Sequence, residues 1–162
     1  IQTYLPTSIR RDHEEGYSYP QNFAEDGAPA GGEAAGTVTV PFSSYKTGVF
    51  TYDVDSGRYL VEEYGKAYVD GDTGEQVGVT NVLVLRTACK ATGDSLGHIT
   101  VDLTGGGDGW FACGGKLIPI CWSKADRNSP LVYTTADDRP LVLGQGSTYV
   151  NIIPRENEIT WE

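Results

Sequence analysis

Val79-Thr-Asn-Val-Leu-Val-Leu-Arg-Thr-Ala-Cys-Lys-Ala-Thr92 is the only stretch of more than ten residues in the chain that lacks both glycine and proline. Glycine costs roughly 1 kcal/mol and proline roughly 3 kcal/mol relative to alanine inside a helix, so length alone would suggest a helix here. β-Branched residues dominate the stretch instead, and they favour strands. These residues are Val79, Thr80, Val82, Val84, Thr87 and Thr92. We therefore predict a long central strand.

Short apolar or alternating runs surround this stretch and are separated by turn signals, as expected of a mainly β antiparallel sandwich or barrel with many hairpins and little helix. Two of the connections have sequences typical of a particular kind of turn. Asp53–Gly57 begins with Asp and ends with Gly, and Cys113–Lys116 contains two central glycines, so both predict hairpins. The predicted strands are Thr37–Phe42, Val49–Val54, Arg58–Tyr64, Val77–Ala88, His98–Leu103, Trp110–Cys113, Lys116–Trp122, Leu131–Thr134, Leu141–Leu143 and Tyr149–Ile153.

Composition restricts the partners that the chain can have. The 162 residues carry a formal net charge of −10, which repels phosphate backbones and anionic lipid headgroups, and no run of Lys and Arg offsets it. We expect a single soluble domain that binds no nucleic acid. No run reaches the ~18 apolar residues that a membrane span needs. Because the chain starts at Ile1 and has no Met, we also expect that a segment preceded it.

The chain divides into two parts by composition. Residues 37–162 carry the strand pattern and form the predicted β-rich domain. Residues 1–36 read as an N-terminal arm or linker, because their Ala/Gly-rich part, Ala24–Gly36, has almost nothing to bury. The segment before it contains Tyr17, Tyr19 and Phe23. It is either an arm laid over the domain or the remnant of a preceding domain.

Motifs spread over residues 37–156 give the chain a recognisable order. They are Tyr52-Asp53, Gly57–Leu60, Asp70, Asp72–Gln76, Asn81–Val84, Gly105–Phe111, Gly115-Lys116, Trp122–Lys124, Ser129-Pro130, Tyr133, Gly146–Val150 and Pro154. This order resembles the C-terminal domain of YerB-like bacterial lipoproteins, a family of unknown function, with Tyr149 where that family usually has Trp. The resemblance implies an exported, membrane-anchored lipoprotein of two domains, with the missing N-terminal domain as its first partner. It implies membrane contact only through an upstream lipid anchor, and it implies no reaction.

The most suggestive cluster for ligand binding is Trp122–Arg127, which follows an apolar strand. An aromatic side chain next to alternating charges can stack on a polar ligand, such as a glycan or an anionic polymer, and hydrogen-bond to it. The alternative is that Trp122 belongs to the core and that Lys124 forms a structural ion pair with Asp126 or Asp70. The predicted ligand-binding residues are Trp110, Trp122, Lys124, Asn81 and Asp70.

Two other segments invite a functional interpretation. Asp70, Asp72 and Glu75 offer oxygen ligands to a hard cation, but their spacing does not fit a calcium loop and suits a solvated turn better. Gly105–Gly109 resembles a phosphate-binding loop, but neither a Lys-Ser/Thr pair nor a helix follows it. We predict a bulge or wide turn at Gly105–Gly109, and no metal or cofactor.

Catalytic motifs are weak. His13 and His98 are the only histidines, and no Gly-x-Ser-x-Gly motif accompanies them. Cys89, Cys113 and Cys121 lack the short paired spacing of zinc sites, so we expect buried thiols or one disulfide.

The leading hypothesis is therefore a non-catalytic ligand-binding or protein-interaction domain at the cell envelope. One rival is a hydrolase of an envelope polymer that uses two facing carboxylates. Candidates for such a pair are Asp53, Asp70, Glu75, Asp102 and Asp126. The other rival is a structural partner of the missing N-terminal domain.

Overall fold

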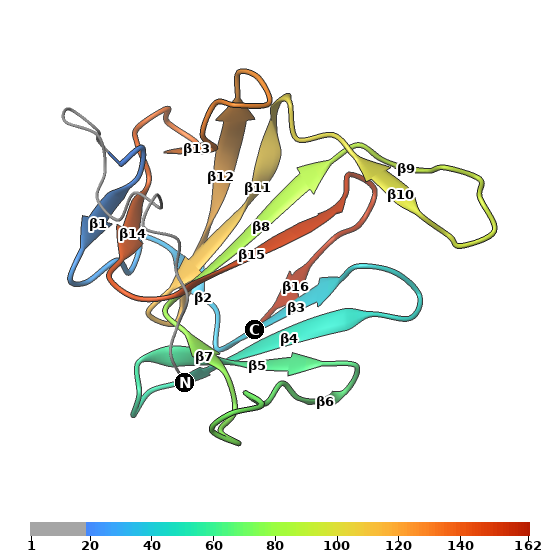
Figure 1. Ribbon diagram of the computed structural model, residues 1–162. Coiled ribbons are helices and arrows are strands. Elements are labelled where there is room, and N and C mark those ends of the chain that lie inside the picture. Colours follow the sequence, from blue (N-terminus) through green and yellow to red (C-terminus); the bar gives the residue numbers. More distant parts are fainter. Residues whose placement is uncertain (1–18) are drawn as a thin grey trace, which may run out of the picture.

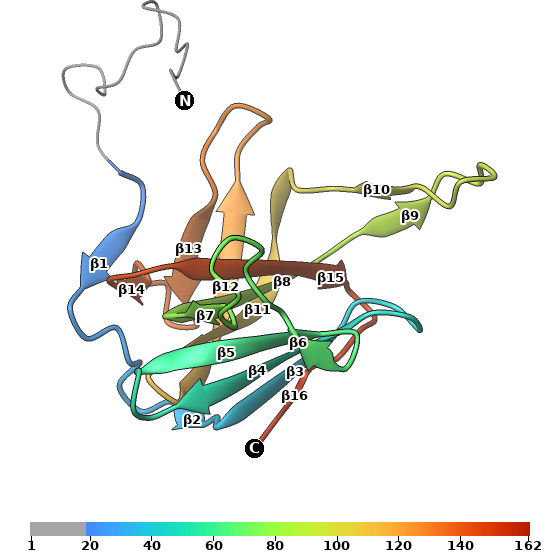
Figure 2. The ribbon, with the colours of Figure 1, turned by 60° about the horizontal axis from the view of Figure 1, so that its bottom comes forward.

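Two six-stranded sheets pack face to face in the computed structural model, which describes residues 19–162 (Figure 1). The main sheet has the order β13 (Val132–Thr135), β12 (Lys116–Lys124), β11 (Gly105–Cys113), β8 (Asn81–Thr87) and β15 (Thr148–Pro154), with β2 (Glu33–Ala34) beside β12. The second sheet has the order β16 (Thr160–Trp161), β3 (Thr37–Pro41), β4 (Thr47–Asp53), β5 (Arg58–Glu63) and β6 (Lys66–Ala67), with β7 (Gly78–Val79) beside β5. Figure 2 shows the two layers from another side.

The mainly β prediction is confirmed, and the sheets form an open sandwich. Two pairs of strands complete the fold: β1 (Asn22–Ala24) with β14 (Val142–Gly144), and β9 (Cys89–Ala91) with β10 (Ile99–Val101). Most neighbours are antiparallel, but β15 runs parallel to β8, and β1 runs parallel to β14. Within the described part of the chain, no helix is long and apolar enough to cross a membrane.

The central strand β8 is buried on both of its faces. Successive side chains of a strand point to opposite sides. Val82 and Val84 therefore join the core between the two sheets, while Leu83 and Leu85 join a second core on the outer face of the main sheet. The near-continuous apolar run of β8 reflects this double burial.

The predicted single strand from Val77 to Ala88 is wrong, because the chain changes sheets within it. β7 pairs with β5 in the second sheet, and β8 begins in the main sheet two residues later. At this change the N–H groups of Thr80 and Asn81 both donate to the carbonyl oxygen of Ser147. After Thr87 the chain continues into β9, which together with β10 projects from the body as an arm (Figures 1 and 2).

Both predicted hairpins are confirmed. Asp53 Oδ2 accepts a hydrogen bond from Ser56 N at 3.0 Å, and Gly57 takes a φ of 66° where β4 turns into β5. Gly114 and Gly115, with φ values of 59° and 72°, join β11 to β12. Positive φ at both central residues matches the right-handed twist of adjacent strands, which explains the two glycines.

The segment Gly105–Gly109 is not a bulge or wide turn but the first half of β11. At Gly106, Gly107 and Gly109, neighbours come too close for a side chain. A Cβ on Gly107 would lie 2.7 Å from Trp122 Nε1, and a Cβ on Gly109 would lie 2.0 Å from the carbonyl oxygen of Val84. The run is therefore a packing surface for β8 and Trp122.

Gly109→Ala is expected to lower the free energy of unfolding by about 2–3 kcal/mol, because the backbone of β8 must move to admit the methyl group. Urea unfolding of the purified variant measures this. Gly71→Ala is the matched control, since nothing lies within 4 Å of its added Cβ, and it should stay within about 0.5 kcal/mol of the parent. Equal stability of the two variants would contradict the close approach of β8 and β11.

The Ala/Gly-rich stretch Ala24–Gly36 was expected to bury almost nothing, but the structure packs it against the domain. β1 pairs with β14, β2 pairs with β12, and Ala35 is fully buried in the core between the sheets. Small residues allow this, because the backbone itself makes the contacts: a Cβ on Gly27 would lie 2.1 Å from Gly144 N. Residues 1–18, including His13 and Tyr17, lie outside the described residues.

Candidate functional site

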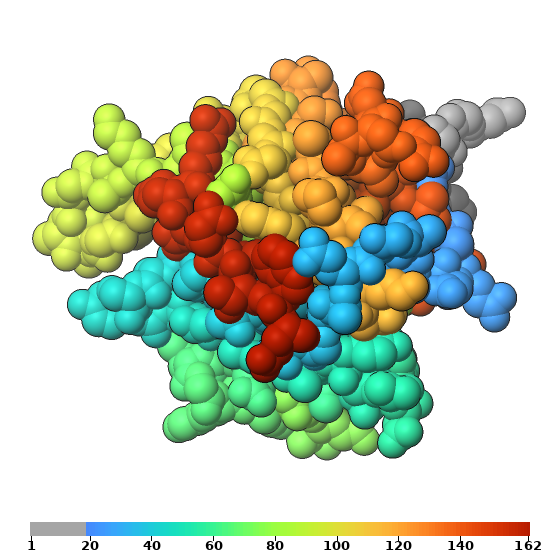
Figure 3. All heavy atoms as spheres, turned by 180° about the vertical axis from the view of Figure 1, so that it is seen from behind, coloured from blue at the N-terminus to red at the C-terminus, as the bar shows by residue number. Residues whose placement is uncertain are grey.

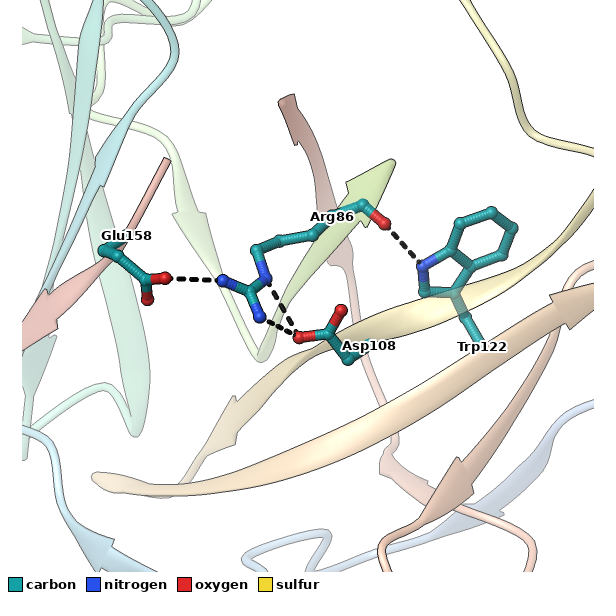
Figure 4. Close-up of polar contacts among 4 residues, drawn as sticks. All are labelled: Arg86, Asp108, Trp122 and Glu158. Atoms are coloured by element: carbon teal, nitrogen blue, oxygen red, sulfur yellow. Dashed lines mark hydrogen bonds and ion pairs between the residues drawn. The ribbon is translucent and has the colours of Figure 1, made fainter. Parts of the chain in front are cut away.

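The structure places Trp122 in the outer core, where it is 2% exposed. Its indole Nε1 donates a hydrogen bond to the carbonyl oxygen of Arg86 at 3.1 Å (Figure 4). A buried tryptophan whose N–H is satisfied by the backbone has no free face for a ligand. In this structure Trp122 is therefore a packing residue, which was the alternative interpretation of its sequence context.

Trp110 lies on the opposite face of the main sheet. It packs against the core between the two sheets, whereas Trp122 belongs to the outer core. The ring of Trp110 lies beneath the guanidinium of Arg86, whose Cζ is 4.9 Å from the ring centroid. The two tryptophans therefore cannot line one groove.

Arg86 contacts both tryptophans, and its guanidinium group also pairs with two carboxylates. Its Nε donates to Asp108 Oδ2 at 2.9 Å, its Nη2 contacts the same oxygen, and its Nη1 donates to Glu158 Oε1 at 2.6 Å (Figure 4). These contacts join β8 to β11 and to the segment before β16. The three groups form a structural clamp between these segments.

Two of the other predicted site residues have structural partners of their own. Asn81 is fully buried and its side chain hydrogen-bonds to Gly144. Lys124 donates to the carbonyl oxygen of Ser129 and holds the loop that follows β12. The structure therefore does not bring the predicted residues into one groove.

Asp70 stabilises a turn in the structure. Its Oδ1 accepts hydrogen bonds from the N–H groups of Asp72 at 3.0 Å and Thr73 at 2.8 Å, and Gly74 follows with a φ of 72°. The hydrogen bonds from Thr73 and Asp72 lower the pKa of the Asp70 carboxyl group. Among residues 19–162, no group of three or more His, Cys, Asp or Glu side chains lies close enough together to hold a metal ion.

The three cysteines lie on three different strands and form no disulfide with one another. Cys113 is buried, Cys89 is half-buried and Cys121 is exposed. Burial raises the pKa of the Cys113 and Cys89 thiols, which opposes formation of a nucleophilic thiolate. His98 directly precedes β10 in the loop of the β9–β10 arm, where its Nδ1 is 2.7 Å from Asp94 Oδ2.

A cleft in the described part of the chain was not predicted from the sequence. It is a cleft of about 280 Å³ between the Ala/Gly-rich segment and the outer face of the main sheet. Three segments far apart in the sequence build it. They are Asp26–Ala30, then Phe111 and Ile118 on β11 and β12, then Thr135 and Arg139–Val142 around β13 and β14. A volume near 300 Å³ is at the lower end of the range for small-molecule sites.

The cleft combines an apolar floor with charged groups at its rim. Phe111 and Leu141 are buried, whereas Arg139 is exposed and its Nη2 lies 2.5 Å from Asp137 Oδ2. Asp26 Oδ1 accepts a hydrogen bond from Ala28 N at 2.9 Å, which orders the opposite wall. Such a lining can bind an apolar group and orient its polar end, as ligand pockets commonly do. The one sequence signal for the cleft is Gly27–Ala30, a run of small residues that lets the backbone of this segment approach the rest of the domain.

The fold and the cleft define a β-sandwich domain with a small apolar cleft and, within residues 19–162, no helix. Residues 38–150 match the model of the family described as "Protein of unknown function (DUF3048) C-terminal domain". The chain belongs to this family, and the predicted kinship with the C-terminal domain of YerB-like proteins is confirmed.

The crystal structure of the YerB protein from Bacillus subtilis has a similar fold, with a TM-score of 0.69 and 22% sequence identity. The match covers 86% of this chain and 46% of the YerB chain, so the chain spans less than half of its length. At this identity the likeness shows the fold alone. The comparison with curated proteins finds no match.

Proposed function

We propose that this chain is a non-catalytic binding domain and that its ligand occupies the cleft between Asp26–Ala30 and the outer face of the main sheet. The observation that carries the proposal is the lining of the cleft: an apolar floor of Phe111 and Leu141, with Arg139 and Asp26 at the rim. A ligand with a short apolar part and a polar or charged end fits this lining. No catalytic step is needed for that role.

The carboxylates favour binding over hydrolysis. A polymer hydrolase needs two facing carboxyl groups, one of them with a raised pKa. Asp26 is the one carboxylate in the lining of the cleft, and Glu162 is the one in a smaller cavity of about 230 Å³ beside β3 and β16. Hydrogen bonds from turn N–H and hydroxyl groups lower the pKa values of Asp53, Asp70 and Asp126, which is opposite to the shift of a general acid.

The setting that we propose is the outside of a bacterial cell, in a membrane-anchored lipoprotein. Support comes from the resemblance of the sequence motifs to YerB-like lipoproteins, a kinship with which the family match and the fold agree. In that setting the ligand of the cleft is an envelope polymer or an envelope protein. The match covers only 46% of the YerB chain. As a second partner we propose a domain that corresponds to the part of the YerB chain outside this match.

Filling the cleft tests the proposal. Ala30 lines the cleft and is exposed, so Ala30→Trp places a large ring in it without disturbing the core. Wild type is expected to bind isolated cell-envelope fractions saturably, and Ala30→Trp to bind at least about tenfold more weakly. Ala67→Trp, on exposed strand β6, is the matched control and should bind like wild type.

Assaying the same incubations for released sugars or peptides separates the rivals. Binding that is lost only in Ala30→Trp, without product release, supports the binding domain. Product release by wild type would favour the hydrolase instead. Absence of binding by wild type would indicate that the cleft is a packing surface for the rest of a longer protein.

A further inference from the structure

The end of the sandwich away from the cleft carries a group of aromatic side chains around a lysine. The β3–β4 turn and the β5–β6 turn meet there, whereas β1 and β14, which flank the cleft, lie at the other end (Figures 1 and 2). The β3–β4 turn (cyan) projects from the surface beside the β9–β10 arm (Figure 3). We call Phe42, Glu63 and Tyr64, which surround the Lys46 ammonium group, the Lys46 cage.

Three groups contact the Lys46 ammonium group at once. Its Nζ lies 3.0 Å from Glu63 Oε1, 4.7 Å from the centroid of the Phe42 ring and 5.8 Å from the centroid of the Tyr64 ring. An ammonium group is attracted to the face of an aromatic ring within about 6 Å, and a carboxylate adds a charge-assisted hydrogen bond. The ammonium group thus has one charge-assisted hydrogen-bond partner and two aromatic rings around it.

Glu63 and Phe42, two members of the Lys46 cage, are held in place by the rest of the domain rather than by Lys46. Tyr149 Oη donates to Glu63 Oε1 at 2.6 Å, and the Tyr149 ring packs edge-on against Phe50 with centroids 5.2 Å apart. The Phe42 ring lies over Gly48, where an added Cβ would be 3.3 Å from its Cε2 atom. Glu63 and Phe42 are therefore held by groups other than the lysine side chain.

Tyr64 provides the second aromatic ring of the cage, and its backbone conformation is unusual. Tyr64 and Gly65, with φ values of 54° and 70°, form the two-residue turn between β5 and β6. Such turns favour Asn, Asp or Gly at the position of Tyr64, and a bulky residue with positive φ is uncommon. Tyr64 is 64% exposed, so burial does not explain its presence. Residues held in sparsely populated conformations cluster at ligand sites.

Electrostatics also favour a cation in the cage. The Glu63 side chain is only 13% exposed. Burial alone would raise its pKa, but the hydrogen bonds from Tyr149 and Lys46 outweigh burial and lower it, so the carboxylate is charged at neutral pH. The net charge of −10 on the whole chain further attracts cationic ligands.

We propose that Phe42, Glu63 and Tyr64 form a binding site for a primary alkylammonium group, the chemistry of a lysine side chain, and that Lys46 is its built-in occupant. An external ammonium group enters when the exposed β3–β4 turn withdraws Lys46. The site is separate from the cleft and does not depend on the ligand proposed there.

Removing the occupant tests this proposal. Lys46→Ala deletes the atoms from Cγ to Nζ, and n-propylammonium chloride supplies the same atoms as a free ligand. Titration followed by the NMR signals of Tyr64 and by the melting temperature measures binding, with sodium chloride matching the ionic strength and 1-propanol as the uncharged analogue. Lys116→Ala, which removes an exposed lysine elsewhere, is the matched control.

Lys46→Ala is expected to bind n-propylammonium at least about tenfold more tightly than wild type or Lys116→Ala, and not to bind 1-propanol. Adding Tyr64→Leu to Lys46→Ala should abolish the gain, whereas adding Ala30→Trp should leave it unchanged. If Lys46→Ala does not fold, Lys46→Gln replaces it, since the amide keeps the turn filled and lacks the charge. Equal affinity of the lysine variant and wild type, or equal binding of 1-propanol, would overturn the proposal.

Discussion

Trp122→Ala is expected to lower the free energy of unfolding by about 3–5 kcal/mol, the usual range for a large aromatic side chain lost from a core. The side chain is 2% exposed and belongs to the outer core with Phe111, Ile120 and Tyr133. Its removal leaves a cavity and deprives the Arg86 carbonyl oxygen of its indole donor. Urea unfolding followed by circular dichroism measures the loss.

Two further variants separate packing from the hydrogen bond. Trp122→Phe keeps most of the apolar volume but lacks the Nε1 donor, so it should cost about 1–2 kcal/mol. Tyr45→Ala removes an aromatic ring that is 89% exposed and should stay within about 0.5 kcal/mol of the parent. If Trp122→Ala kept full stability but lost binding to the envelope fractions, the ligand-stacking role first predicted for Trp122 would be correct.

The strands were predictable where their signal is local. The runs that became β3, β4, β5 and β12 are apolar or alternating over a few residues and end at turn residues, so their limits agree with the structure within about two residues. The division of the central run was not predictable. Val79 and Val82 look alike in sequence, yet one lies in the second sheet and the other in the main sheet. Ser147, far along the chain, accepts the hydrogen bonds at that change of sheet.

The candidate site was harder to predict than the fold. Trp110 and Trp122 are near in sequence and both aromatic, but the antiparallel register places Trp110 opposite Pro119 and Trp122 opposite Gly107. Because 107 and 110 differ by an odd number, the two rings point to opposite faces. The cleft was missed since its wall, Asp26–Ala30, packs through backbone atoms and has no apolar pattern.

Asn81→Leu is expected to cost about 4 kcal/mol of folding stability, although both side chains have four heavy atoms and branch at Cγ. The Asn81 side chain pairs with the buried Gly144 as a neighbouring strand would: Oδ1 accepts from Gly144 N at 2.8 Å, and Nδ2 donates to Gly144 O at 2.8 Å. Nδ2 also lies 3.1 Å from Thr148 Oγ1. Leucine leaves two buried backbone groups without partners, at about 1–3 kcal/mol each. Equilibrium urea unfolding measures the loss.

Asn151 provides the matched comparison, because it is equally buried and lies on the neighbouring strand β15. Its Nδ2 donates one hydrogen bond to Leu83 O at 3.0 Å, but its Oδ1 has no partner. Asn151→Leu removes an unsatisfied acceptor together with that one bond, so it should cost about 1 kcal/mol. A difference of about 3 kcal/mol between the two variants would show that Asn81 holds β14 in place. It would then also hold the wall of the cleft that β14 forms. Equal losses would mean that burial of the amide, rather than its pairing with Gly144, determines the effect.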